Sequence, residues 1–385
     1  MAPVVVRILH PEPGPAAGPL ERLVADARSR VAEAHGAGFL AAGADDVSIV
    51  AGPPDDTPFG ARLRRLADRD RPGGIVVLGS GAIPLATAAD RRDFVVAARG
   101  PGRRALANNR YSADVIAVAE ACTLTEVPDL AGDNALPRWL AEVAGYEVTD
   151  LARRWRLAID IDGPLELLLI GGVGGRSARW NEAPDPIDAG LVLERLGRVE
   201  AVAADRRAEL LVAGRTSAAT LGWLERHAAC RVRALVEERG LRASTRLALG
   251  PDPSTGGRPA TGRPATARAR PPANHARPPA SVLGALLDRD GPTSLGVHLA
   301  RLADAAVVDS RVLLAHRLGA DESRWPVAED RFASDLLLPD RIVDPWLREL
   351  TAAAVGASIP IVLGGHTLVG PGVRLVVRRR PGARR

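Results

Sequence analysis

Two carboxylates in the middle of the chain offer the clearest chemistry that the sequence contains. Asp160 and Asp162 lie in the stretch RLAIDIDGPLELLLIGG, residues 156–172, where a short apolar run meets an Asp-x-Asp-Gly-Pro turn before a second apolar run. Interpreted as a strand that ends in a turn, the first run places both side chains on one side of the backbone. Two carboxylates beside an apolar core are costly unless a cation or an arginine compensates them. The turn is therefore either a metal or ligand site or a solvated strand end.

The basic side chains narrow the chemistry further. None of the 385 residues is a lysine, so all 51 cationic side chains are arginines, and the formal net charge is +5. A P-loop lysine, a Schiff base and a lysine phosphate clamp are excluded, and arginine has to bind any anion. Aromatic residues make up only 3% of the chain, too few for base-stacking platforms. We therefore expect no nucleic-acid partner.

Length, hydropathy and cysteine content indicate a cytoplasmic protein. The chain is long enough for two domains and is 46% hydrophobic. No apolar run approaches the roughly 18 residues of a membrane span, and the first residues lack a signal-peptide pattern, so we expect no membrane partner. Cys122 and Cys230 are too few and too far apart for a disulfide framework or a metal knuckle, and they are interpreted as core residues. The oligomeric state is left open.

The apolar runs predict an α/β fold with two modules, each a mostly parallel sheet flanked by helices. In the first module, expected strands at 4–9, 46–51 and 74–78 alternate with helices that begin at 19 and span 59–67 and 89–98. In the second, strands are expected at 208–213, 231–236, 305–314 and 359–363, with helical patterns at 218–226 and 282–287. We expect domains at 1–170 and 191–385, a linker at 171–190, and a disordered Pro/Gly/Ala/Arg-rich insertion at 250–280.

Polar residues follow two segments of the first module where a ligand crevice is expected. In an open α/β sheet this crevice lies at the carboxyl ends of the strands. The candidate ligand-binding residues here are Gly79, Ser80 and Gly81 after the third strand, and Asn108, Asn109 and Arg110 before the apolar run VIAVA. The glycines could let backbone amides approach a phosphate. A tight turn without ligand and a capped, solvated segment are the competing interpretations.

The second module has its own polar strand ends. Arg215 and Ser217 follow a strand and open a helix, the geometry in which amides, a guanidinium and a hydroxyl bind an anion. His366 follows two glycines at the end of the last strand, which places a titratable group where backbone can approach a ligand. Three alternatives stay open. They are a hydrolase triad of Ser217 or Ser334 with His366 and Asp335 or Asp309, a metal site of His316, His366, Asp309 and Asp335, and ordinary caps and ion pairs.

The first 170 residues or so resemble nucleotidyltransferases of the GT-A fold. The resemblance rests on a strand followed by Gly-Ser-Gly-Ala-Ile-Pro-Leu, a helix, a polar insertion, and a late strand that reads L-x-I-D-I-D-G-P. Cofactor guanylyl- and cytidylyltransferases, such as 2-phospholactate guanylyltransferase and the molybdenum-cofactor enzymes, are the most similar members. The resemblance implies that Asp162, and with it Asp160, stands on the side of a Mg²⁺ cofactor. It assigns Ser80 and Gly81 to the position at the strand end.

The chain departs from this family at two places that matter for catalysis. The family's glycine-rich loop, which wraps the triphosphate, should follow the first strand, where this chain has HPEPGP at residues 10–15, and the catalytic lysine is missing. The family's mid-domain metal carboxylate is replaced within Gly79–Gly81. Two hypotheses follow: a divergent nucleotidyltransferase acting on a nucleotide and a phosphorylated small molecule or cofactor precursor, with Arg110 or Arg215 supplying positive charge, or a non-catalytic protein that binds a nucleotide or sugar phosphate. A hydrolase centred on His366 is a third.

Overall fold

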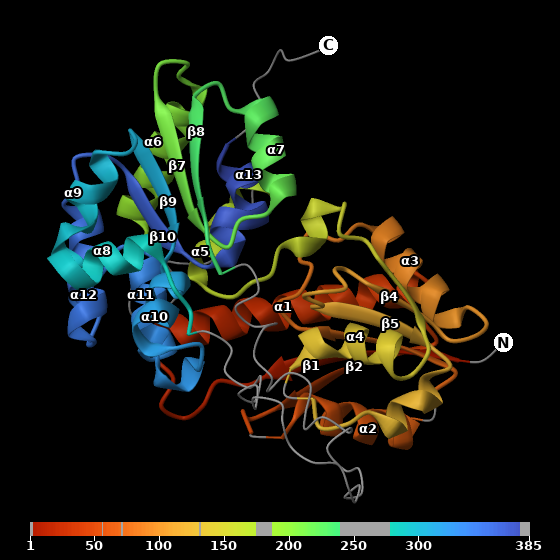
Figure 1. The fold of residues 1–385 in the computed structure, drawn as a ribbon. Helices are drawn as coiled ribbons and strands as arrows, with labels where there is room; N and C mark the ends of the chain where they lie inside the picture. Colours follow the sequence, from red (N-terminus) through yellow and green to blue (C-terminus); the bar gives the residue numbers. More distant parts are fainter. Residues whose placement is uncertain are drawn as a thin grey trace, which may run out of the picture.

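The chain folds into two α/β modules, each built around its own sheet (Figure 1). The computed structural model describes residues 3–55, 57–70, 72–130, 132–174, 187–238 and 278–377. The first sheet has the strands β1 (Val4–Pro11), β2 (Asp46–Gly52), β3 (Gly74–Gly79), β4 (Arg104–Ala107), β5 (Val115–Ala119) and β6 (Glu147–Asp150). The second has the strands β7 (Glu209–Gly214), β8 (Arg231–Val236), β9 (Ala305–Asp309) and β10 (Ile361–Gly364).

The first sheet is mostly parallel and buried on both faces. Its strand order is β2-β1-β3-β5-β4-β6, and only β5 runs antiparallel to its neighbours. Alternate residues of β1 enter different cores: Val4 and Val6 pack with α1 (Pro19–Ala41) and α3 (Ala88–Arg99), whereas Val5 packs with α2 (Phe59–Asp70) and α4 (Leu136–Glu142). Because both faces are covered, the strands need continuous apolar runs, which is what the sequence shows.

The second sheet is entirely parallel, in the order β10-β9-β7-β8. Its strands share one core with surrounding helices. These helices are α6 (Gly190–Ala204), α7 (Ala218–His227), α8 (Val282–Asp290), α9 (Leu295–Ala300), α10 (Ser310–Leu318), α11 (Ala328–Asp335), α12 (Pro345–Val355) and α13 (Val373–Val376). In a parallel sheet all carboxyl ends lie at one edge, so Gly214, Asp309 and Gly364 end their strands on the same side.

Two helices tie the modules together. The amino-terminal part of α1 reaches α11, and Leu20, Leu23 and Val24 belong to the core of the second sheet (Figure 1). α5 (Pro164–Gly174) packs Leu165 and Leu169 into the same core. The segment 164–174 is thus packed with the second sheet, although it precedes the expected linker in sequence.

Glu329 of α11 forms the most direct polar link between the modules. Its carboxylate accepts hydrogen bonds at 3.1 Å from the backbone amides of Leu20 and Glu21, at the start of α1. The N-cap residue Gly18 has no side chain for this purpose. A negative charge from the second module therefore caps a helix of the first, where the unpaired amides and the helix dipole favour it.

The α/β class and the two mostly parallel sheets flanked by helices are confirmed. The structure places strands within one residue of the expected positions at 46–51, 74–78 and 208–213, and the strand expected at 231–236 has those bounds. Helices also begin where expected near 19, 59 and 89. The short strands β4, β5 and β6 were not predicted, because four or five residues carry too little periodicity to be separated from loops.

One predicted strand is wrong, and another ends earlier than expected. Residues 155–158 form a 3₁₀ turn, and Asp160 makes only an isolated bridge to Ala82, because no further strand lies alongside it. The apolar run after the turn is the helix α5. The strand expected at 305–314 ends at Asp309, whose side chain accepts the amide of Arg311 and so caps α10. A continuous apolar run does not distinguish a buried strand from a buried helix, which explains both errors.

Parts of the expected linker and insertion lie outside the described residues, which omit 175–186 and 239–277. The predicted disorder at 250–280 therefore stays a prediction. Within the described ranges, no helix has the length and apolar composition that crossing a bilayer requires.

Candidate functional site

The carboxyl edge of the first sheet gathers acidic side chains from distant parts of the chain. β3 ends at Gly79 and β4 at Ala107, while the antiparallel β5 begins at the same edge just after Asp114. The Asp-x-Asp turn reaches this edge from the far side of the module, through the bridge between Ala82 and Asp160. The sheet topology therefore brings Asp114 and Asp160 close together at the carboxyl edge, which is the usual ligand position in such sheets.

The Gly79–Gly81 turn fixes the position of Asp160. The amide of Ile161 donates to the carbonyl of Gly81 at 3.1 Å, and a Cβ on Gly81 would lie 3.0–3.1 Å from the Ile161 carbonyl and the Asp160 carboxylate. A side chain at Gly81 would thus push the acid away, which explains the glycine. At Gly79 a Cβ would meet nothing within 4 Å, so the space next to the strand end is open.

Ser80 faces His10 rather than the open crevice. It is 2% exposed, and its hydroxyl lies 3.0 Å from His10 Nδ1. The Ser80 amide donates to the carbonyl of Leu9 at 2.9 Å, which extends the β1–β3 contact beyond the end of β3. His10 thus stands at the position where the resembling family has its phosphate loop, and it is held there by the predicted site residue Ser80.

Asn108 is a positioning residue for Asp114. Its amide nitrogen donates to the Asp114 carboxylate and to the Leu157 carbonyl, both at 2.8 Å, and its oxygen accepts the amides of Asp114 and Val115. Both donors and both acceptor positions of this buried amide are therefore used within the protein. The side chain locks an acid into the crevice and leaves no hydrogen-bonding group for a ligand.

Burial and mutual repulsion raise the pKa of two of the acids at this edge. Burial and the carboxylate of Asp162 raise the pKa of Asp160 to about 7, although Arg28 acts in the opposite direction. Burial, followed by the charges of Asp160 and Asp133, raises the pKa of Asp114 well above its usual range. The Asp160 carboxyl also shares a hydrogen bond with Asp162. Like charges this close hold a proton, or attract a cation, near neutral pH.

Two basic side chains border Asp162 from opposite modules. Arg28 of α1 donates through Nε to the Ile161 carbonyl at 2.7 Å, and its Nη2 lies 3.9 Å from Asp162 Oδ1. His366, just after β10, places Nδ1 at 3.6 Å from Asp162 Oδ2. Asp162 and His366, which the sequence named as separate candidates in two modules, therefore lie next to each other, although Asp162 follows a single bridge and not a strand.

The carboxyls of Asp160 and Asp162 are suitable ligands for part of the coordination shell of Mg²⁺. Mg²⁺ is usually held by one or two carboxylates together with substrate phosphates and water, rather than by a complete protein cage. The paired carboxyls of Asp160 and Asp162, with the raised pKa of Asp160, supply such a partial set. Within the described ranges, no three His, Cys, Asp or Glu side chains already surround a single metal position. The ligand would have to complete the coordination.

Asn109 and Arg110 lie at the outer rim of the same edge. Asn109 Oδ1 accepts the amide of Tyr111 at 2.9 Å and so closes a local turn. The guanidinium of Arg110 lies 5.6 Å from the ring centre of the exposed Tyr111. Both side chains are positioned by the β4–β5 loop, within reach of solvent rather than inside the acidic cluster.

The predicted residues of the second module are engaged in ion pairs and caps. Arg215 binds Asp309 through Nε at 2.6 Å and Nη2 at 3.1 Å. Ser217 caps α7 by accepting the Thr220 amide. These contacts match the interpretation as caps and ion pairs, and they leave Arg215 without a free face for an anion.

The side chains proposed for a hydrolase are likewise paired elsewhere. Ser334 is completely buried and lies 2.8 Å from the hydroxyl of Thr351. Asp335 is bound by both terminal nitrogens of Arg311. His316 contacts Asp288 at 3.0 Å and the Ser281 amide at 3.1 Å. The contacts that these side chains make do not support the triad or the metal site of the second module.

Sequence reasoning missed two central residues of this site. Asp114 is the last residue of the polar segment 108–114 and directly precedes the apolar run VIAVA. Its position before a strand could have marked it as a site residue. Arg28 has no such signal, because it lies on an ordinary helical face and meets Asp162 only through packing between segments 134 residues apart in sequence.

No protein-family model matches the chain, and no curated protein matches it.

Proposed function

We propose that the chain is a divergent nucleotidyltransferase-like protein that joins part of a nucleotide to a phosphorylated small molecule or cofactor precursor, with Mg²⁺ as cofactor. The observation that carries this proposal is the group of carboxyls at the carboxyl edge of the first sheet, Asp114, Asp160 and Asp162, in which burial and mutual repulsion raise the pKa of Asp114 and Asp160. The resemblance of residues 1–170 to the GT-A nucleotidyltransferases gives the reaction class.

In that reaction an acceptor phosphate oxygen attacks the α-phosphorus of a nucleoside triphosphate. A new oxygen–phosphorus bond forms, the bond between the α-phosphorus and its bridging oxygen breaks, and pyrophosphate leaves. Mg²⁺ held by Asp160 and Asp162 would supply charge neutralisation for the phosphates. The protein's part is positioning: Asn108 orients Asp114, Gly81 sets Asp160 against the turn, and Arg28 stands next to Asp162.

Arg28 replaces the arginines named from the sequence as the source of positive charge. Arg215 is bound to Asp309, and Arg110 stays at the rim on Tyr111. Arg28 already reaches the acidic cluster and could contact a phosphate with the atoms that do not bind the Ile161 carbonyl. A guanidinium can perform this role without lysine because its fork of donors matches phosphate oxygens.

A non-catalytic binding protein is the second candidate, and one observation favours it. In the resembling family the loop after the first strand wraps the triphosphate, and a helix start is a natural anion site. Here the start of α1 is already occupied by the carboxylate of Glu329. Because Glu329 fills this anion site, the start of α1 cannot stabilise a triphosphate during transfer. The protein could still bind a nucleotide or a sugar phosphate at the acidic edge.

Titration calorimetry with GTP, CTP, ATP and UTP, each with and without Mg²⁺, tests the proposal. We expect Mg²⁺-dependent binding of one nucleotide, at least about tenfold weaker in Asp160→Asn and Asp162→Asn, because each change removes a charged ligand. The matched control is Asp26→Asn, an exposed acid on α1.

Pyrophosphate release with candidate acceptors then separates the two functions. Release by the wild-type chain that is lost in Asp162→Asn supports the transferase. Nucleotide binding that does not need Mg²⁺, without pyrophosphate release, supports the binding protein instead. If none of the four nucleotides binds under either condition, the transferase and a nucleotide-binding protein are both wrong, and only the binding of a sugar phosphate remains to be tested.

A further inference from the structure

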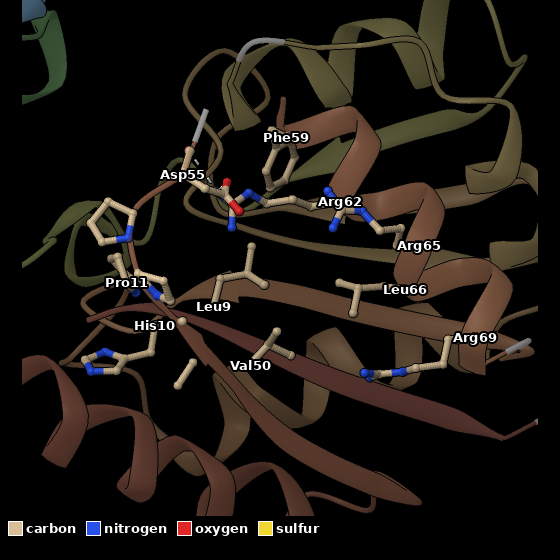
Figure 2. A pocket seen from close by; sticks show the side chains of 14 residues that line it. Leu9, His10, Pro11, Val50, Asp55, Phe59, Arg62, Arg65, Leu66 and Arg69 are labelled. Atoms are coloured by element: carbon tan, nitrogen blue, oxygen red, sulfur yellow. Dashed lines mark hydrogen bonds and ion pairs between the residues drawn. The ribbon is translucent and has the colours of Figure 1, made fainter. Parts of the chain in front are cut away.

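A cavity lies where β1 and β2 end, next to α2, and Asp114, Asp160 and Asp162 are not among its lining residues. Its volume is about 610 Å³, and it is formed by the ends of β1 and β2 and by one side of α2 (Figure 2). β2 is the edge strand of the sheet, so the cavity opens at the side of the module. Ligand cavities commonly range from about 300 to 1,000 Å³, which is the size of a small organic molecule.

The alternation of β1 separates this cavity from the acidic site. Leu9 points toward α2 and packs with Val50 and Phe59 at the outer end of that core. His10, the next residue, also lines the cavity, while its ring contacts Ser80 on the other side of the strand; neither Asp160 nor Asp162 is a lining residue. Figure 2 shows the His10 ring on the far side of β1 from Leu9. A ligand in this cavity would therefore contact neither Asp160 nor Asp162.

The cavity combines an apolar floor with a row of arginines. Leu9, Val50 and Leu66 form the floor (Figure 2). Arg62, Arg65 and Arg69 line the side that belongs to α2. Spacings of three and four residues place these arginines on one helical face, so their positive ends share one space.

The charges around this row do not cancel at Arg65. Arg62 is paired with Asp55, and Arg69 donates to Asp70 at 2.8 Å. Within the part of the chain that the structure describes, Arg65 forms no ion pair, and its charge acts only at longer range on Asp55. Asp55 is the one acid among the described lining residues. A cavity with excess positive charge and low-dielectric walls attracts anions.

We propose that this cavity binds a small organic phosphate whose body is apolar, with the phosphate on Arg65 and its neighbours and the body on Leu9, Val50 and Phe59. A dianionic phosphate suits several guanidinium groups better than a single carboxylate does, because each planar fork can donate two hydrogen bonds. The site needs no metal and is independent of the proposed transferase function.

Calorimetric titration of the full chain with phenyl phosphate, in buffer with EDTA, tests the site. We expect saturable binding that is at least about tenfold weaker in Arg65→Gln, because a charge-assisted hydrogen bond is lost. Arg92→Gln is the matched control: it removes the same charge from an exposed position on α3, across the sheet, and should leave the affinity within twofold of wild type. Circular dichroism and thermal unfolding verify that both variants fold.

Three further ligands define the chemistry. Inorganic phosphate should bind more weakly than phenyl phosphate, because it cannot use the apolar floor. Phenol should not bind measurably, and benzoate should bind at least about fivefold more weakly than phenyl phosphate. Benzoate that binds as tightly would overturn the assignment to a phosphate.

Other outcomes also contradict the proposal. Absence of phenyl phosphate binding at millimolar concentration overturns it, as does equal weakening by Arg65→Gln and Arg92→Gln, which would indicate general screening. Displacement of phenyl phosphate by a nucleotide would make the cavity part of the nucleotide site. Because this assay contains no metal, its failure leaves the Mg²⁺-dependent nucleotide titration as a separate result.

Discussion

The carboxyl edges of the two sheets use acidic residues in opposite ways. At the first edge, Asp160 has its pKa raised to about 7 by burial and by Asp162. At the second, Asp309 is more completely buried, at 1% exposed, yet its pKa lies below the usual range because Arg215 outweighs the effect of burial. Depth alone therefore does not decide the state of these two carboxylates, because at Asp309 the nearby positive charges, Arg215 first among them, outweigh the effect of burial.

This difference separates a structural edge from a candidate ligand edge. A carboxylate with its own arginine has satisfied its charge and its hydrogen bonds, so a ligand has little to offer it. Carboxylates that oppose one another store repulsion, and a cation or a proton relieves it. The ion pair at the second edge thus contributes to the stability of the module, while the raised pKa of Asp160 and Asp114 at the first edge is what the proposed Mg²⁺ site rests on.

The largest expected effect is the loss of stability when the ion pair at the second edge is removed. Asp309→Asn should lower the free energy of unfolding by about 3–5 kcal/mol, because it leaves Arg215 buried without a negative partner. Asparagine can still cap α10 in the same position, so the loss reports the ion pair. Urea unfolding measures it.

The control for this change is Glu142→Gln, which removes an exposed pair with Arg138. Its expected effect is within about 0.5 kcal/mol. A loss below about 1 kcal/mol for Asp309→Asn would mean that water compensates the second edge, and the contrast between the edges would disappear.

The pH dependence of stability tests the first edge. Between about pH 4 and 7 the folded chain keeps a proton on Asp160 that the unfolded chain releases, so this group makes stability fall as pH rises through that window. Urea unfolding at several pH values should show a contribution of up to about 1.4 kcal/mol per pH unit. Asp160→Asn should remove it.

Asp26→Asn again serves as the control, and its profile should match that of the wild-type chain. If the free energy of unfolding changes with pH equally in the wild-type chain and in Asp160→Asn, the pKa of Asp160 is not raised by repulsion at the first edge. Asp160 would then resemble Asp309, and the case for a cation at this edge would fail.

The smallest expected effect concerns the link between the two regions. Glu329→Gln keeps the shape of the side chain but removes the charge that faces the start of α1, so the free energy of unfolding should fall by about 1 kcal/mol. Glu349→Gln, on an exposed position of α12, is the control and should be neutral. If Glu329→Gln also strengthens nucleotide binding, its carboxylate competes with a ligand phosphate; an unchanged affinity assigns it to capping alone.

The sequence by itself determined the class of fold and most of the long elements. Apolar runs such as 4–9 and 74–78 are buried on both faces, and that requirement is local enough to be read from composition. The sequence also placed Asp160, Asp162 and His366 near strand or turn ends, because glycines and prolines mark those ends. The excluded lysine chemistry likewise follows from composition alone.

The tertiary structure decided how these residues act. Asp160 was expected on a strand and instead lies on a single bridge, held by Gly81, 79 residues away in sequence. Arg28 and Asp114 join the site because α1 passes this edge of the sheet and the antiparallel strand β5 begins there. The pKa of an acidic side chain depends on charges a few ångströms away. Those charges are brought together by tertiary packing and not by their order along the chain. Local sequence patterns contain no information on these distances. They therefore identified the acidic residues but not which of them are paired with an arginine.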